Sequence, residues 1–153
     1  NILKATPPLE VRWKQSLHAA VKMADDPKIK SGTRYDALRM VAMLDYEKCQ
    51  QQLKRYLMDA TQAELQMGAV SGLGDINTPE AAQDLIAALP NLTPRNRKLA
   101  VEALVRTEAR TLMLLQVLEK KELTAELVDA AVQQQLKMSD NAEIQKRAQT
   151  VFP

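Results

Sequence analysis

The chain has 153 residues, of which 46% are hydrophobic and 26% are charged, the composition of an ordinary globular domain. Its 21 basic and 19 acidic side chains leave a net charge of +2, which excludes recognition of nucleic acid or of an acidic membrane by charge alone. No apolar run reaches the ~20 residues that a membrane-spanning helix needs, so we expect no membrane insertion by this segment. Aromatic residues make up only 3% of the chain, which favours packed helices over sheets.

We expect residues 1–6 to form a frayed lead-in and the first helix to begin near Leu9. Apolar residues then recur at intervals of four, four, three, one and three, which is the stripe of an amphipathic helix. They are Leu9, Trp13, Leu17, Ala20, Val21 and Ala24. The stretch Asp25-Asp26-Pro27 should end this helix.

Six more helices are predicted before the C-terminal end. They cover residues 34–44, 47–60, 64–74, 79–89, a range that begins at Pro94, and 108–121. Thr78-Pro79 and Thr93-Pro94 are helix starts, because a threonine hydroxyl accepts an orphan N–H and a proline at the first helical position has none to lose. Two short antiparallel helices cannot bury their apolar faces alone, so these pairs need copies on either side.

The spacing of buried-type residues indicates a repeat of two helices. Ala37, Ala69 and Ala100 follow one another at 32 and 31 residues. On the second helices, Leu53 precedes Leu85 by 32 residues, and Leu57 precedes Leu89 by the same interval. A helical repeat of this length is typical of a solenoid. We therefore predict an all-α fold, a short α-solenoid of about four helix pairs after one N-terminal helix.

The C-terminal end matches the repeat less well. A helix is predicted over residues 124–138, with Gln133-Gln134-Gln135 where apolar residues are expected. Asp140 should then cap a last short helix, with Glu143 as its capping-box partner. Divergence of this kind is what a terminal capping repeat needs, because its outer face meets water.

Residues 69–89 carry the pattern Ala…Leu-Gly-Asp-Ile…Pro-Glu-Ala…Leu…Leu, which resembles bacterial HEAT-type repeats. The match consists of Leu73, Gly74, Asp75, Ile76, Pro79, Glu80, Ala81, Leu85 and Leu89. The resemblance implies stacked helical hairpins, and it is not specific to any function.

The C-terminal third has a narrower resemblance. Leu114-Leu115-Gln-Val-Leu118-Glu, Leu123…Leu127, Val132…Gln135-Leu136 and Ile144…Arg147-Ala148…Val-Phe152 are similar to a segment of planctomycete-type membrane-bound dehydrogenase and haem-binding proteins. In that family a HEAT-like region leads into a c-type cytochrome domain, which implies an extracytoplasmic location. This chain has no Cys-x-x-Cys-His, so the resemblance places haem c in a neighbouring domain and no cofactor in this segment.

Few residues are candidates for catalysis or for binding a metal or cofactor. His18 has no carboxylate or cysteine at ligand spacing and is expected at the surface. Cys49, the only cysteine, falls on the inward face of its helix and is interpreted as a small buried hydrophobe. No paired carboxylates and no Gly-rich phosphate loop are present, so we predict no catalytic residue, no metal ligand and no cofactor-binding residue.

Four residues are the candidates for contact with a partner. Lys54 and Arg55 form a small basic cluster, and we expect Arg55 to pair with Asp84 of the next repeat. The helix that contains Met113 and Val117 is apolar almost all round, and we expect these two residues to form part of a patch that a neighbouring domain covers.

The chain begins at Asn1 rather than at Met, so we expect residues 1–153 to be a single HEAT-like repeat domain excised from a larger multidomain protein. The predicted function is a non-catalytic scaffold in a dehydrogenase-like c-type cytochrome, with neighbouring domains or a protein as partner and no nucleic acid. Three alternatives stay open. They are a subunit like the HEAT-containing bilin lyases, a DNA-binding solenoid like the alkylpurine glycosylases, and a free-standing adaptor.

Overall fold

The computed structural model describes residues 7–153, so the lead-in expected at residues 1–6 lies outside the described part. Within residues 7–153 the chain forms nine α-helices and no strand. The helices are α2 (Pro7–Asp25), α3 (Ser31–Val41), α4 (Tyr46–Leu57), α5 (Ala63–Asp75), α6 (Pro79–Ala88), α7 (Pro94–Leu104), α8 (Glu108–Glu119), α9 (Ala130–Lys137) and α10 (Ala142–Val151). Two short 3₁₀ turns, η1 (Leu89–Asn91) and η2 (Ala125–Leu127), lie between them.

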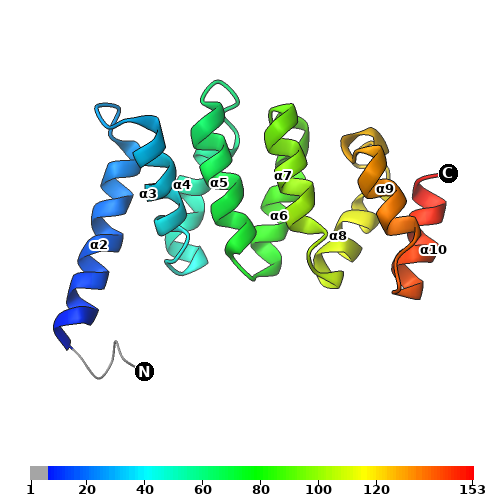
Figure 1. The fold of residues 1–153 in the computed structure, drawn as a ribbon, viewed down its shortest axis with the longest axis horizontal. Helices are drawn as coiled ribbons and strands as arrows, with labels where there is room; N and C mark the ends of the chain where they lie inside the picture. Colours follow the sequence, from blue (N-terminus) through cyan, green and yellow to red (C-terminus); the bar gives the residue numbers. More distant parts are fainter. Residues whose placement is uncertain (1–6) are drawn as a thin grey trace.

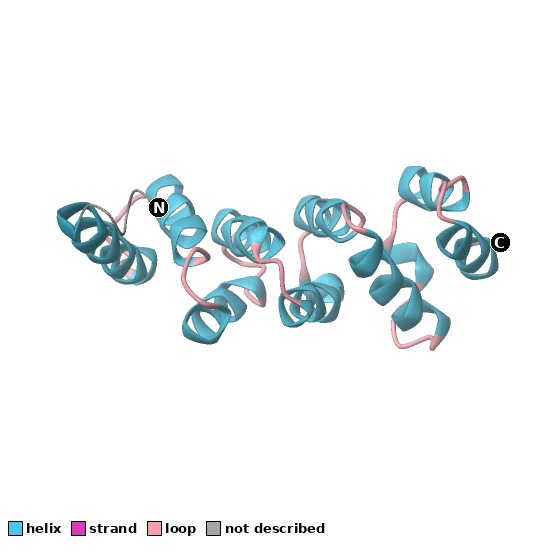
Figure 2. Ribbon diagram, turned by 90° about the horizontal axis from the view of Figure 1, so that it is seen from below, coloured by secondary structure: helices cyan, strands magenta, loops and turns pink. Residues whose placement is uncertain are grey.

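The helices stand side by side in a row, and each runs antiparallel to the one before it (Figure 1). Seen from below, α3, α5 and α7 lie in one layer and α4, α6 and α8 in the other (Figure 2). Four hairpins, α3–α4, α5–α6, α7–α8 and α9–α10, follow the single helix α2. This arrangement confirms the predicted all-α solenoid.

Burial follows the repeat that the sequence predicts. Ala37, Ala69 and Ala100 are buried where successive first helices meet, and the four leucines of the second helices are buried as well. Thr78 and Thr93 cap α6 and α7 as expected, since their hydroxyls accept the N–H groups of Ala81 and Asn96. One continuous apolar core therefore runs along the whole stack.

Glycines set the distance between α3 and α5. A Cβ at Gly72 would lie 3.0 Å from the Cβ of Ala42, and a Cβ at Gly68 would lie 3.2 Å from the ring of Tyr35. Both glycines point at α3 from one face of α5, one helical turn apart. The absence of side chains there lets the two helix backbones approach closely.

A polar bond also recurs with the repeat. In each hairpin, the residue four positions after the N-cap of the first helix donates to a carbonyl at the end of the preceding helix or 3₁₀ turn. The four bonds are Arg34 Nε to Ala24 O (2.9 Å), Gln66 Nε2 to Leu57 O (3.0 Å), Arg97 Nε to Leu89 O (2.9 Å) and Gln133 Nε2 to Val128 O (2.8 Å). Each bond satisfies a carbonyl near the end of a helix or 3₁₀ turn, and the carbonyl of Leu89 also accepts the N–H of Leu92 at 3.4 Å. Each bond therefore fixes a hairpin against the element before it.

The donors of these bonds are spaced by 32, 31 and 36 residues, so the fourth hairpin is displaced along the chain. The extra residues lie in the connection between α8 and α9. The single helix predicted over residues 124–138 is wrong for this reason. Val128 is extended and Asp129 accepts the N–H of Val132, so α9 starts only at Ala130.

The predicted cap of the last helix is also wrong. Asn141, not Asp140, is the N-cap of α10, and its side-chain oxygen accepts the N–H groups of Glu143 and Ile144. An asparagine and an aspartate are equally good caps, so the sequence alone did not distinguish two adjacent candidates.

Three helices differ from the prediction in detail. α3 and α4 end at Val41 and Leu57, about one turn before the predicted ends at residues 44 and 60. In α2 the apolar stripe is buried only in its second half, from Leu17 onward. Leu9 and Trp13 are 42% and 39% exposed, because α2 is longer than α3 and extends past the stack (Figure 1).

The Glu119 carboxylate of α8 accepts from Arg147 Nε at 2.6 Å and from Nη2 at 3.0 Å, which ties the fourth hairpin to the third. Arg147 lowers the pKa of Glu119 below its ordinary value of 4.5. A carboxylate with a lowered pKa stabilises the fold above its unfolded-state pKa and loses this effect as the pH falls through the folded-state value. A double-mutant cycle with Glu119→Gln and Arg147→Gln should give a coupling of about 0.5 kcal/mol at neutral pH that shrinks below about pH 4.5. A coupling that does not change with pH would contradict this assignment.

Candidate functional site

Lys54 and Arg55 bind carboxylates of this chain. Arg55 pairs with Asp25 of α2 through two bonds of 3.2 Å, so the expected pair with Asp84 is wrong. Lys54 lies 3.5 Å from Asp84 instead, and the same carboxylate accepts the hydroxyl of Tyr46. Successive positions on a helix point in directions about 100° apart, which sends Arg55 back to α2 and Lys54 forward to α6. A role of these two residues toward a partner stays a prediction.

Met113 and Val117 line a groove between α6 and α8. Both are half-buried, and the groove, of about 440 Å³, is completed by Ile86 and Ala87 of α6 and by Leu123 of the following loop. Gln83, Gln116 and Glu122 form its polar rim. The groove is a shallow apolar surface on the layer that α4, α6 and α8 form. We call these residues the α6/α8 groove.

Cys49 is buried with 0% exposure, and its thiol points to the carbonyls of Leu44 and Tyr46. His18 is exposed on α2, as expected. Within residues 7–153, no cluster of three His, Cys, Asp or Glu side chains is placed to hold a metal ion. Among the helices of the same residues, none is both long and apolar enough to cross a bilayer.

Burial raises the pKa of the Cys49 thiol, so little thiolate is present at neutral pH. We expect the native protein to react with Ellman's reagent at pH 8 at least about 100-fold more slowly than the unfolded protein, because the thiol must first be exposed by opening of the fold. A stopped-flow assay with and without guanidinium checks this. Reaction of the native protein at the unfolded rate would place Cys49 at the surface.

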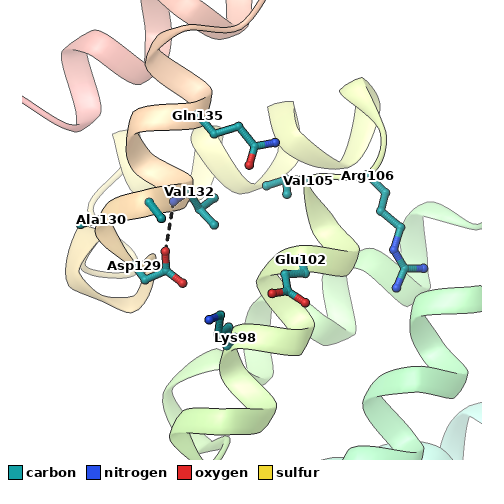
Figure 3. A pocket seen from close by; sticks show the side chains of 9 residues that line it. Lys98, Glu102, Val105, Arg106, Asp129, Ala130, Val132 and Gln135 are labelled. Atoms are coloured by element: carbon teal, nitrogen blue, oxygen red, sulfur yellow. Dashed lines mark hydrogen bonds between the residues drawn. The ribbon is translucent and has the colours of Figure 1, made fainter.

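A second hollow lies between α7 and α9. The first helices α3, α5 and α7 pack directly on one another, whereas α7 and α9 barely touch. They leave a cleft of about 860 Å³ (Figure 3). Its lining is Lys98, Glu102, Val105 and Arg106 on the α7 side and Asp129, Ala130, Ala131, Val132 and Gln135 on the α9 side. We call this the α7/α9 cleft. A smaller hollow continues it from Val105 and Gln135 to Asp140.

The composition of the α7/α9 cleft explains why it is open. Counted from the helix N-caps, Gln135 takes the place of Gly68, one of the two residues that let α5 approach α3. On the facing side, Lys98 takes the place of Tyr35. A glutamine and a lysine cannot form a dry helix contact without burying unpaired polar groups. α9 therefore stays apart from α7.

Sequence reasoning did not find this cleft. Lys98 is close in sequence to Arg95 and Arg97, yet Arg97 turns inward to the carbonyls of Leu89 and Leu92. The available signal was the interval of 36 residues between Arg97 and Gln133, which exceeds the repeat. A longer interval means that the fourth hairpin cannot stack in the same register.

The comparisons with known proteins found no relative of this chain. No protein-family model matches it, and neither a curated protein nor a solved structure gives a match.

Proposed function

We propose that this chain is a non-catalytic structural domain, a HEAT-like solenoid that holds neighbouring domains at a fixed separation. The observation that carries the proposal is the polar bond that recurs in all four hairpins. Together with the continuous core, these bonds join each hairpin to the element before it. A body built in this way keeps its two ends at a fixed distance and orientation, as a spacer requires.

The parent protein that we propose is a dehydrogenase-like c-type cytochrome of the planctomycete type, located outside the cytoplasm. The support is the resemblance of the C-terminal third of the chain to a segment of that family. In this proposal haem c belongs to a neighbouring domain and the partners of the solenoid are other parts of the same protein. The decisive observation is the sequence of about 100 residues after Pro153, the size of one small domain. A Cys-x-x-Cys-His there supports the proposal, and its absence from the whole parent protein refutes the haem assignment.

The α6/α8 groove is the proposed docking site of a neighbouring domain, because Met113 and Val117 leave apolar surface of α8 open to solvent. In the parent protein, cross-linking through Lys121 should give links to a residue outside this segment. Met113→Asp with Val117→Asp should abolish these links, since two carboxylates cannot be buried without partners. Ala109→Asp, an exposed position on the same helix, should leave them unchanged. Links that survive the double substitution would contradict docking at this groove.

A free-standing adaptor is the second candidate, and the same groove supports it, because an apolar seat with a polar rim suits a partner protein as well as a tethered domain. The length of the parent protein separates the two. An open reading frame that adds no further domain to this segment would favour the adaptor.

A further inference from the structure

The α7/α9 cleft carries polar groups that the fold leaves without partners. Within residues 7–153, no ion pair and no side-chain hydrogen bond involves Lys98, Glu102 or Gln135, and all three side chains are exposed. The close view places Lys98 and Glu102 on one wall, with Gln135 on the other side (Figure 3). Arg106 has only a weak contact, 3.9 Å from Asp75 between two groups that are more than half exposed.

These charges alternate in sign at intervals of four residues. Lys98 and Glu102 lie on α7, and Arg106 follows two residues past its end, so the three read basic, acidic, basic. Four residues of an α-helix rise by about 6 Å, and Arg106 follows just after the helix end. In an extended chain, side chains on the same face are about 6.6 Å apart. A strand that lies along α7 therefore presents every second side chain close to one of these three charges.

The opposite wall suits the other face of such a strand. Ala130 and Ala131 are small and exposed, and Val132 lies beneath them, while the Asp129 carboxylate on the same wall accepts the N–H of Val132. Apolar side chains of modest size fit against this wall, and the amide of Gln135 can donate to and accept from a peptide backbone.

We propose that the α7/α9 cleft binds an extended segment of a partner protein in which charged and apolar residues alternate as acidic, apolar, basic, apolar, acidic. The two acidic residues pair with Lys98 and Arg106, and the basic residue pairs with Glu102. The charge pattern reads the same in both directions, so it specifies the partner sequence without fixing the polarity of the bound chain. This site goes beyond the scaffold function, because it adds a recognition surface that the α6/α8 groove does not share.

The test uses two fluorescent nonapeptides, Gly-Ser-Glu-Val-Lys-Val-Glu-Ser-Gly and its charge-swapped form Gly-Ser-Lys-Val-Glu-Val-Lys-Ser-Gly. Fluorescence anisotropy with the full chain at low salt should give saturable binding of the first, at least about tenfold tighter than the second. The variant K98E/E102K/R106E should reverse this preference. All three residues are exposed, so the variant should fold, and an unchanged melting temperature verifies this.

Three results would overturn the proposal. They are no saturable binding of either peptide up to about 1 mM, equal binding of both, and a preference that the triple substitution does not move. A doubled mass in light scattering that the triple substitution abolishes would assign the cleft to a second copy of this chain instead. Since none of these readouts involves Met113 or Val117, failure here leaves the test of the scaffold function standing. If the triple variant does not fold, Glu102→Lys alone should still reduce the preference for the first peptide.

Discussion

Replacement of Gln66 by glutamate is expected to destabilise the protein by about 4 kcal/mol at neutral pH, since it buries a charge and breaks hydrogen bonds in one step. Gln66 has 0% exposure, and all of its polar capacity is used. Its amide nitrogen donates to the carbonyls of Leu57 and Asn91, and its oxygen accepts from Thr93 N–H and Asn96 Nδ2. A glutamate would set a carboxylate oxygen against two carbonyl oxygens.

Urea denaturation at neutral pH measures this effect, and Gln83→Glu, at an exposed position of α6, is the matched control with an expected change within about 0.5 kcal/mol. The burial should raise the pKa of the new carboxyl, so its cost should decrease as the pH falls and the group becomes protonated in both states. A loss of less than about 1 kcal/mol would mean that the Gln66 network is not part of what holds the second hairpin to the third.

Replacement of Gly72 by valine is expected to cost about 3 kcal/mol or more, the upper range for overpacking. The first atom of the new side chain would lie 3.0 Å from the Cβ of Ala42 and 3.4 Å from the Leu38 carbonyl oxygen. The Ala42 Cβ is attached directly to the backbone at the C-cap of α3, and the Leu38 oxygen is itself a backbone atom of α3. Neither can move aside by a side-chain rotation, as the end of a long side chain could. The two helices must separate, which loosens the core around Leu53.

Gly32→Val is the control for this prediction. A Cβ at Gly32 would meet only the Glu64 carboxylate, at 3.7 Å, so we expect a change within about 0.5 kcal/mol. Thermal denaturation followed by circular dichroism compares the two. Equal effects of the two substitutions would contradict the close approach of α3 and α5.

The regular part of the fold was predictable because its causes are local or periodic. Thr78 and Thr93 are caps whose partners lie three residues away, and Ala37, Ala69 and Ala100 repeat at a constant interval. The polar bonds of Arg34 and Gln66 were not predicted, although the two residues are also 32 apart. Their acceptors are backbone carbonyls, which every residue carries, so no residue type reveals the partner.

The candidate sites were predictable only in part. The near-continuous apolar character of α8 indicated that Met113 and Val117 need cover, and both lie in a groove that leaves them half-buried. The α7/α9 cleft was missed, because it results from a change of register in the loop before Asp129 and not from any motif. Gln133 was interpreted as a sign of divergence, yet it forms the same bond to a preceding carbonyl as Gln66.

The central claim is that similar hairpins are stacked along one axis as a rigid body. Double electron–electron resonance, which measures the distance between two nitroxide spin labels, tests this claim most directly. The labels are placed in a chain that carries Cys49→Ala. Position 48 carries one label, and positions 80, 109 and 143, exposed in the first turns of α6, α8 and α10, carry the other in turn. Stacked hairpins predict three narrow distributions whose means increase by about 9 Å per hairpin. Means that do not increase with hairpin number, or broad distributions for all three pairs, would contradict the account.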